Sequence, residues 1–256
     1  MKILVTGHKG FIGSHMVRAL KDHEVTTFEW DNDTSTWPSV KGLDWVIHIG
    51  AISSTVEQDV NKILRQNYEF SVWLFENCKQ HNVNLQYSSS ASVYGLISTF
   101  REDAILNPCN HYATSKMMFE EYAKKYTHGN IVQGFRYFNV YGPEGEERKG
   151  DQASPYAKFK KQAEETGRIK VFEGSEQFCR DFVHVSTIVD THIKFLDINE
   201  SGIWNVGTGK PTSFMDVAKS FNVPIDTIPM PDILKDSYQK YTCADLTKLN
   251  KTINMV

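Results

Sequence analysis

Three glycines with the spacing Gly-x-x-Gly-x-x-Gly lie between the first predicted strand and the first predicted helix. The strand is expected at Lys2–Thr6, the glycines fall within Gly7–Gly13, and the helix is expected at Ser14–Lys21. Glycine permits a sharp turn and lets a phosphate approach the backbone, and a helix N-terminus favours negative charge. This position predicts a dinucleotide site, with the candidate residues Gly7, Gly10, Phe11, Ile12 and Gly13.

Short β-rich segments alternate with longer helical ones over the first 140 residues. Further strands are expected at Glu24–Trp30, Asp44–Ile49, Asn84–Ser88 and Ile131–Tyr137, and helices at Asn61–Lys79 and Tyr112–Tyr126. Such alternation is typical of a parallel sheet covered by helices. We therefore predict an α/β fold, a Rossmann-type doubly wound parallel sheet with a small, truncated C-terminal substrate lobe.

The regular alternation ends after Val140. Gly142–Asp151 is predicted to be a loop and Ser154–Glu165 a helix with Pro155 in its first turn. The segments Phe182–Val185, Ile188–Leu196 and Ile203–Val206 are expected to return to the first layer. The predicted division is a nucleotide-binding domain of residues 1–141 with 181–208, and a substrate lobe of residues 142–180 and 209–256. No final helix is expected after Leu249.

Composition excludes several classes of protein. The 256 residues carry 28 Lys+Arg and 31 Asp+Glu, a net charge of −3, which gives no electrostatic reason to expect nucleic acid or an anionic membrane as partner. No apolar run approaches the ~20 residues that a bilayer span needs. Cys78, Cys109, Cys179 and Cys243 lack any Cys-x-x-Cys spacing, so neither a metal site nor a disulfide framework is expected. We expect a cytoplasmic protein that binds small molecules.

Polar residues at the end of the second predicted strand bear on the choice of cofactor. Glu29, Asp31 and Asn32 are placed to contact the adenosine ribose, where a carboxylate accepts hydrogen bonds from the hydroxyls and repels a 2′-phosphate. No Lys or Arg lies between Trp30 and Val40 to bind such a phosphate. NAD is therefore favoured, with NADP as the alternative. The alternative interpretation is that one of these two acidic residues, Glu29 or Asp31, is only a solvated turn residue without contact to a cofactor.

Tyr112 and Lys116 lie one turn apart on the same face of a predicted helix. A phenol has a pKa of ~10 and needs a shift of about 3 units to act at neutral pH, which a lysine cation and a positive nicotinamide ring would supply. Helices produce this pair by chance. It gains weight from Ser88–Gly95 at the end of the preceding strand, where a serine can hydrogen-bond a substrate hydroxyl.

Gly7–Gly13, Ser88–Gly95 and Tyr112–Lys116, in this order, resemble the extended short-chain dehydrogenases/reductases of the nucleotide-sugar epimerase/dehydratase group. The resemblance implies a nucleotide-diphosphate sugar as substrate and an intramolecular oxidation and reduction through NAD. It implies Ser90, Tyr112 and Lys116 as the catalytic trio. It also implies that the cofactor is lined by Gly50, Ala51, Ser53, Asn67 and Val140.

Two later segments, Phe172–Val183 and Pro231–Gln239, are similar to the ADP-heptose 6-epimerases. That branch uses a second acid/base in the loop after Asn-Val-Tyr-Gly-Pro, which Lys149 matches. The resemblance further implies that the ADP-sugar is held by Asn139, Asp151, Lys158, Phe172, Glu173, Gly174, Ser175, Arg180 and Tyr238. The planar fork of Arg180 suits a diphosphate.

The chain departs from the pattern of that branch in its loop and in one missing strand. The loop before Lys149 is one residue longer, and Asp151 and Lys158 replace a serine and a histidine. The segment Asn32–Leu43 is too short for a further strand.

Three alternatives stay open. A UDP- or GDP-hexose 4-epimerase needs no second base, and gains weight if Lys149 is a solvated loop lysine. A 4,6-dehydratase is disfavoured because Ala91 and Ser92 stand where an Asp-Glu pair is needed, and a non-catalytic NAD-binding regulator is disfavoured by the intact trio. A homodimer or larger homo-oligomer is expected, because the helices Asn61–Lys79 and Tyr112–Tyr126 form a dimer bundle in similar enzymes. His48 is expected to be a packed core residue.

Overall fold

The structure is a computed structural model that describes residues 1–30, 36–126, 129–231 and 239–255, apart from the side chain of Asp151. In chain order the elements of the first part are β1 (Lys2–Thr6), α1 (Phe11–Ala19), β2 (Glu24–Phe28), β3 (Trp45–His48), α2 (Val60–Ile63), the π-helix η1 (Leu64–Glu69), α3 (Phe70–His81), β4 (Asn84–Ser90), η2 (Ala91–Tyr94), α4 (His111–Tyr126) and β5 (Val132–Tyr137). The second part contains β6 (Asn139–Tyr141), η3 (Glu146–Gln152), α5 (Pro155–Thr166), β7 (Ile169–Phe172), β8 (Cys179–Arg180), β9 (Phe182–His184), α6 (Val185–Phe195), β10 (Gly202–Val206), β11 (Thr212–Ser213), α7 (Phe214–Lys219), β12 (Ile225–Ile228) and α9 (Thr247–Ile253).

The centre of the molecule is a six-stranded sheet in the order β10-β5-β4-β3-β1-β2, with every neighbouring pair parallel. Every residue of β3 and β5 is buried, as expected for strands covered on both faces. The predicted doubly wound α/β fold is confirmed. The strand order reverses between β1 and β3, and ligands of such sheets bind in the crevice beyond the carboxyl ends of the strands at this point.

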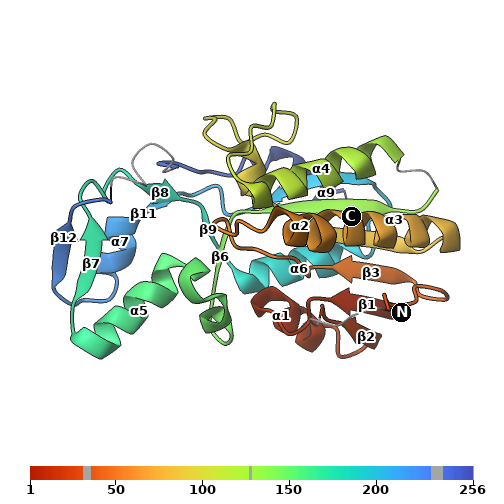
Figure 1. Ribbon diagram of the computed structural model, residues 1–256, viewed down its shortest axis with the longest axis horizontal. Helices are drawn as coiled ribbons and strands as arrows, with labels where there is room; N and C mark the ends of the chain where they lie inside the picture. Colours follow the sequence, from red (N-terminus) through yellow and green to blue (C-terminus); the bar gives the residue numbers. More distant parts are fainter. Residues whose placement is uncertain (31–35, 127–128, 232–238, 256) are drawn as a thin grey trace.

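Helices cover both faces of the sheet (Figure 1). On one face, Phe70, Leu74 and Phe75 of α3 and Phe119 of α4 pack against Leu85 of β4 in a continuous apolar cluster. On the other face, the apolar side chains of α1 and α6 pack together over β1 and β3.

Two helical predictions need correction. The helix expected at Asn61–Lys79 is interrupted by the π-helix η1, which turns the buried Asn67 toward the carboxyl ends of the strands; π-helical turns are frequent at functional sites. A helix does follow near Leu249: α9 packs on β10, with Leu249 in the same apolar cluster as Trp204 and with the Trp204 indole donating a hydrogen bond of 3.0 Å to Thr252.

The remaining strands form small pairs beside the main sheet. β7 pairs with β12 and β8 pairs with β11, and together with α5 and α7 they lie at the left end of the molecule in Figure 1. They share their own apolar cluster, which includes Phe159, Val171 and Met215. α5 begins as predicted, with Ser154 as its N-cap and Pro155 in its first turn. In the described part of the chain, no helix combines the length and apolar character needed to cross a membrane.

Candidate active site

The glycine-rich turn is built so closely that side chains are excluded from it. A Cβ atom on Gly7 would lie 2.4 Å from the Cα atom of Gly50, and one on Gly13 would lie 2.0 Å from the carbonyl oxygen of Gly7. Gly7 also has a φ of +74°, which glycine adopts without strain. The turn therefore brings the ends of β1 and β3 together at the N-terminus of α1 and leaves backbone exposed there. This cradle fits the pyrophosphate of a dinucleotide.

Glu29 follows β2 and contacts this turn directly. Its carboxylate accepts a hydrogen bond of 2.8 Å from the backbone N–H of Lys9, and the His8 ring nitrogen lies 3.8 Å away. Among the three predicted ribose candidates, Glu29 is thus the one whose contact with the glycine-rich turn is described. Asp31 and Asn32, the other candidates on this segment, lie outside the described residues.

The turn after β3 is held in place by Asn67. The Asn67 amide accepts a hydrogen bond of 2.8 Å from the Ile52 N–H, and donates to the Ile52 carbonyl at 3.0 Å and to the Ser115 hydroxyl at 3.1 Å. This amide therefore ties the turn to α4 and positions it, which the sequence did not suggest. Ala51 is half-buried and Ser53 is exposed in the same turn.

His48 ends β3 below this turn as a buried residue. Its ring nitrogens bind the hydroxyls of Thr6 at 2.7 Å and Ser71 at 2.8 Å. Burial first, and the charge of Lys116 second, lower the pKa of His48 to about 3. His48 is 1% exposed, as predicted for a packed core residue.

Helix α4 meets the end of β4 through the predicted trio. The half-buried Tyr112 is hydrogen-bonded to the side chain of Ser90. The Lys116 ammonium donates to the Ser88 carbonyl at 2.9 Å and reaches the Ser88 hydroxyl at 3.4 Å. The i, i+4 spacing on one helix face therefore brings both side chains to the same strand end.

Burial controls the protonation of both groups. It lowers the pKa of Lys116 to about 8, against an opposing effect of Glu120. It raises the pKa of Tyr112, against the hydrogen bond from Ser90. In the protein alone, Tyr112 is therefore a protonated phenol at neutral pH. Positive charge beside the ring would be required for it to accept a proton.

Lys149 lies far in sequence from the glycine-rich turn but folds against it. Its ammonium is 4.9 Å from the centre of the Phe11 ring and donates a hydrogen bond of 3.0 Å to the Val140 carbonyl. Burial lowers its pKa, although Glu146, 3.9 Å away, acts in the opposite direction. A side chain only 22% exposed does not fit the description of a solvated loop lysine.

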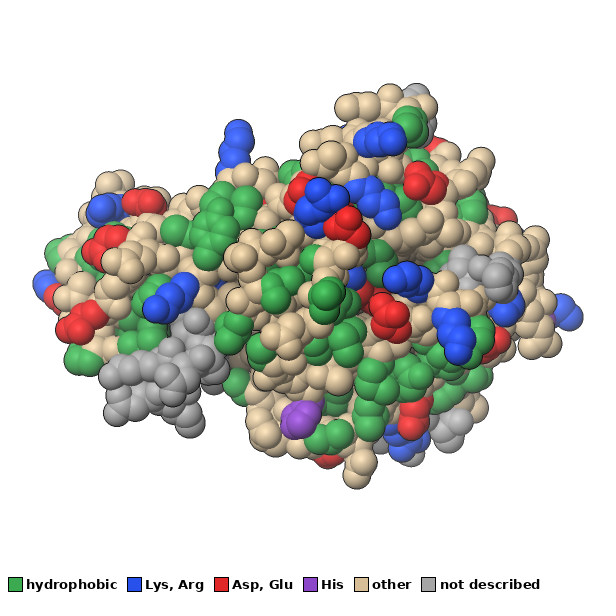
Figure 2. Space-filling model, turned by 90° about the horizontal axis from the view of Figure 1, so that it is seen from above, with side chains coloured by type: hydrophobic (Ala, Val, Ile, Leu, Met, Phe, Trp, Pro, Cys, Tyr) green, Lys and Arg blue, Asp and Glu red, His purple; other side chains and the backbone are tan. Residues whose placement is uncertain are grey.

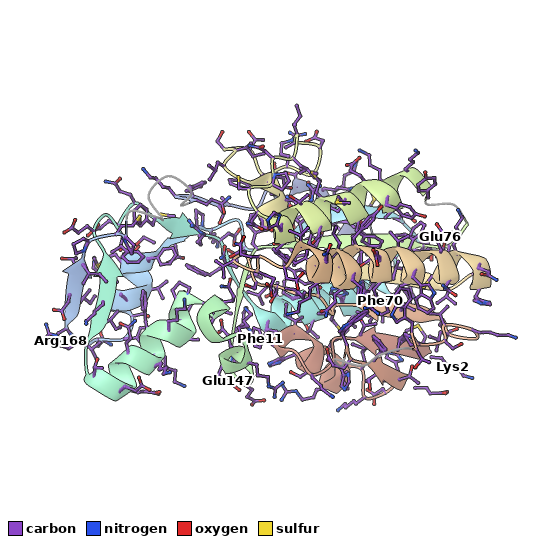
Figure 3. All side chains as sticks on the ribbon, viewed as in Figure 1. Lys2, Phe11, Phe70, Glu76, Glu147 and Arg168 are labelled. Carbon is purple, nitrogen blue, oxygen red and sulfur yellow. The ribbon has the colours of Figure 1, made fainter. Side chains whose placement is uncertain are left out.

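The loop that carries Lys149 is fixed by contacts to itself and to the glycine-rich turn. The buried Glu146 accepts hydrogen bonds from the backbone N–H groups of Gly142 at 3.1 Å and Ser154 at 2.7 Å. Arg148 donates to the Lys9 carbonyl at 2.9 Å. Figure 3 shows Phe11 next to this loop, near the labelled Glu147. The segment predicted as a loop therefore contains two short helical turns that meet at a kink at Gly150, and Glu144 and Gly145 before them have positive φ.

The other predicted substrate residues are spread over β6, α5 and the β7–β8 region. Arg180 is buried, with its guanidinium 5.5 Å from the centre of the Phe214 ring. Ser175 is also buried, and its hydroxyl donates a hydrogen bond to the Phe172 carbonyl within the same turn. Phe172 and Gly174 are half-buried, whereas Asn139, Lys158 and Glu173 are exposed. Asp151 lies in η3 with no described side chain, and Tyr238 lies outside the described residues.

Sequence reasoning missed three buried charged residues that support the site. Glu120 and Arg136 form an ion pair of 2.7 Å behind the end of β4, and Glu146 closes the Lys149 loop. Only Glu120 carried a local signal, because it continues the four-residue spacing of Tyr112 and Lys116. Arg136 and Glu146 reach their partners only through the fold.

Comparisons with known proteins agree with this geometry. The profile of the NAD dependent epimerase/dehydratase family matches residues 3–207. The sequence is 36% identical, over an alignment of 288 residues, to the ADP-L-glycero-D-manno-heptose-6-epimerase of Brachyspira hyodysenteriae, covering 96% of this chain and 90% of that protein.

Solved structures share the fold. The ADP-L-glycero-D-manno-heptose-6-epimerase of Helicobacter pylori superposes with a TM-score of 0.86 at 23% identity, covering 99% of this chain and 90% of that one. The UDP-N-acetylglucosamine 4-epimerase of Methanobrevibacter ruminantium, solved with UDP-N-acetylmuramic acid, gives a TM-score of 0.87 at 25% identity, covering 98% and 91%.

Proposed function

This chain belongs to the NAD-dependent epimerase/dehydratase family, and on that premise we propose that it is a nucleotide-sugar epimerase that inverts C6 of an ADP-activated heptose. The predictions of an enzyme of this family and of NAD as its cofactor are confirmed. The observation that carries the choice of reaction is the placement of Lys149. Tyr112, beside Ser90, is the first ionisable group. Lys149 is a second one, and it lies against Phe11 of the glycine-rich turn.

In this mechanism Tyr112 exchanges a proton with the substrate hydroxyl. The Ser90 hydroxyl, hydrogen-bonded to Tyr112, orients the same substrate oxygen, and Lys116 brings its ammonium to the Ser88 carbonyl of the same strand end. When bound, NAD supplies the hydride acceptor and, in its oxidised form, a positive charge. Tyr112 takes the proton of the C6 hydroxyl as the C6–H bond breaks, and a 6-keto sugar forms.

Inversion requires the C6 carbonyl of the 6-keto sugar to receive hydride on the opposite face. The carbonyl oxygen then lies on the side of the site away from Tyr112. We propose that Lys149 gives the proton to that oxygen. Burial supports this role because it lowers the Lys149 pKa toward neutrality. The contact with Phe11 supports it because it places the ammonium at the start of α1, beside the cofactor turn.

For the nucleotide diphosphate, the buried Arg180 is the proposed anchor. Phe172 ends β7 and is followed by Glu173 and Gly174 in a turn, whereas Asn139 of β6 and Lys158 of α5 are exposed. Asp151 and Tyr238 stay predictions on the resemblance alone.

A hexose 4-epimerase is the second candidate, since a solved 4-epimerase has the same fold at 25% identity. Proton NMR of ADP-D-glycero-D-manno-heptose incubated with the protein and NAD distinguishes the two. Appearance of the C6 epimer supports the proposal. An unchanged heptose, together with inversion at C4 of UDP-N-acetylglucosamine in a parallel tube, contradicts it and favours the second candidate. Tyr112→Phe serves as the inactive control.

Three further features stay proposals. Residues 1–141 with 181–208 would bind NAD, and residues 142–180 with 209–256 would bind the sugar. Within the second set, α9 is an exception, because it packs on the main sheet. A homodimer would form through η1, α3 and α4, where Tyr68 of η1 and Tyr122 and Tyr126 of α4 lie partly exposed beside one another. A cytoplasmic location stays a prediction.

A further inference from the structure

Glu120 is a buried carboxylate that contacts the strand bearing the proposed catalytic serine. It is 1% exposed and accepts a hydrogen bond from the hydroxyl of Ser89, the neighbour of Ser90. The Arg136 guanidinium binds its two oxygens at 2.7–3.3 Å. A charge-assisted bond to a buried carboxylate is strong and geometrically specific, so Glu120 fixes the position of the Ser89 side chain.

Three residues on one face of α4 hold three consecutive serines at the end of β4. Tyr112, Lys116 and Glu120 are four residues apart and so stand above one another on the helix. They contact Ser90, Ser88 and Ser89 respectively. Glu120 is therefore the third member of the row that sets α4 against β4.

Glu120 also affects the protonation of Lys116. Burial disfavours the ammonium form of Lys116, and Glu120 is the charge that opposes it. From β3, His48 faces the ammonium but is kept neutral by burial. Arg136 on β5 compensates the Glu120 charge, and Tyr87 on β4 stays a neutral phenol because burial raises its pKa.

We propose that Glu120 is a positioning residue of the active site, which holds the Ser88–Ser90 strand end in register and keeps Lys116 charged for the reaction. Arg136 acts behind it as the cation that stabilises the buried carboxylate. This inference rests on the proposed function, because it assumes that Ser90 and Lys116 serve the epimerisation.

A cavity gives this pair a route to small solutes. It has a volume of about 640 Å³, lies against the second half of α4, β10 and α9, and is lined by both Glu120 and Arg136. None of the predicted catalytic residues lines it. Figure 2, viewed from the side of α4, shows positive and negative side chains interspersed over the half of the surface that carries the main sheet. Because the cavity is lined by both residues, a small carboxylate can reach Arg136 through it once the Glu120 side chain is removed.

The first test compares pH profiles of kcat. Glu120→Gln keeps hydrogen-bonding groups for Arg136 and Ser89 but removes the charge, so the alkaline limb of the profile is expected to move to lower pH, with KM changed less than threefold. Ser89→Ala keeps the charge, so kcat is expected to fall about tenfold without movement of the limb. An unmoved alkaline limb in Glu120→Gln would overturn the proposed electrostatic role.

The second test is chemical rescue through the cavity. In Glu120→Ala, added formate or acetate is expected to restore kcat at least tenfold, in a saturable way, and to move the alkaline limb back. The matched control is Tyr94→Phe, which removes a different partner of Arg136, the Tyr94 hydroxyl at 2.9 Å. It is expected to respond to neither carboxylate. Equal responses of both variants to added salt would indicate a structural effect and overturn the proposal.

A measurement without substrate separates this inference from the proposed function. Because Lys116 titrates in the folded state, the free energy of unfolding rises with pH above the Lys116 pKa. In Glu120→Gln this rise is expected to begin at lower pH than in the wild type. If the wild type epimerises no sugar and the rise still shifts, the proposed function fails and the Glu120–Lys116 coupling stands. An unshifted rise contradicts the coupling.

Discussion

The ammonium of Lys116 donates a hydrogen bond of 2.9 Å to the backbone carbonyl of Ser88, 28 residues earlier in the chain. A buried cation is thereby bound to the strand end that carries Ser90. The ammonium form of Lys116 is stabilised by the Ser88 carbonyl and by the carboxylate of Glu120. The cost of burying that charge makes the stability of the protein depend on pH.

Replacing Lys116 should expose this dependence. Burial lowers its pKa from 10.5 to about 8. Below pH 8, Lys116 is charged both in the folded state, where the charge is buried, and in the unfolded chain, where it is hydrated. Between pH 8 and 10.5 the unfolded chain binds more protons than the folded state, so the free energy of unfolding of the wild type rises with pH. The stability advantage of Lys116→Met over the wild type should be about 2 kcal/mol larger at pH 7 than at pH 9.5. Urea unfolding at both pH values measures it, and equal differences would contradict the buried charge.

Tyr112→Phe removes the phenolic proton but keeps the ring. Loss of a positioned acid/base typically costs about 10²–10⁴ in rate, and we expect a loss in that range for kcat. NADH affinity, measured by fluorescence titration, should change less than twofold. Tyr126→Phe, at an exposed position of the same helix, should keep full activity. A Tyr112→Phe enzyme with wild-type kcat would exclude the phenol as the base.

Lys149→Met tests the second acid/base. Because Lys149 contacts the Phe11 ring and the Val140 carbonyl, we expect inversion at C6 to fall at least a hundredfold while NAD remains bound. Lys161→Met removes a lysine of α5 whose side chain is 74% exposed and which has no proposed role in the site; it is the matched control, with inversion unchanged. Proton NMR follows both variants. Undiminished inversion in Lys149→Met would assign Lys149 a structural role.

Gly13→Ala should damage the cofactor cradle. Its Cβ atom would lie 2.0 Å from the Gly7 carbonyl oxygen, whereas a Cβ on Gly10 would lie 3.2 Å from the same atom. We expect NAD affinity, measured by calorimetry, to fall more than tenfold in Gly13→Ala and by a smaller factor in Gly10→Ala. Circular dichroism controls for folding. Equal affinities of folded Gly13→Ala and wild type would show that the turn does not hold the dinucleotide.

Tyr122→Arg tests the proposed dimer surface. Tyr122 is partly exposed on α4 and bonds Glu76 of α3 at 2.7 Å. Placing an arginine there puts a long, positively charged side chain in the proposed helix bundle of each subunit, so light scattering should report a monomer. Tyr241→Arg changes a tyrosine that is 47% exposed outside these helices and should leave the mass unchanged. A wild-type monomer, or a dimer in Tyr122→Arg, would contradict this surface.

Local patterns accounted for the parts of the site that depend on short stretches of chain. The turn Gly7–Gly13 needs glycine whatever surrounds it, since the backbone closes on itself there. The contact row of Tyr112 and Lys116 follows from helical spacing, and the parallel sheet follows from the alternation of strands and helices. Each of these is a property of neighbours in sequence, which is why the sequence by itself determined the fold class and the placement of Tyr112 and Lys116 on one helix face, whereas the catalytic trio stays a prediction.

Only the tertiary structure decided how that site is supported. Asn67 was predicted to line the cofactor, yet a π-helical turn directs its amide to Ile52 and Ser115. Lys149 is separated from Phe11 by most of the first domain, and Arg136 of strand β5 reaches Glu120 of helix α4. Buried polar groups must find partners wherever packing brings them, and sequence spacing carries no record of contacts made across the sheet.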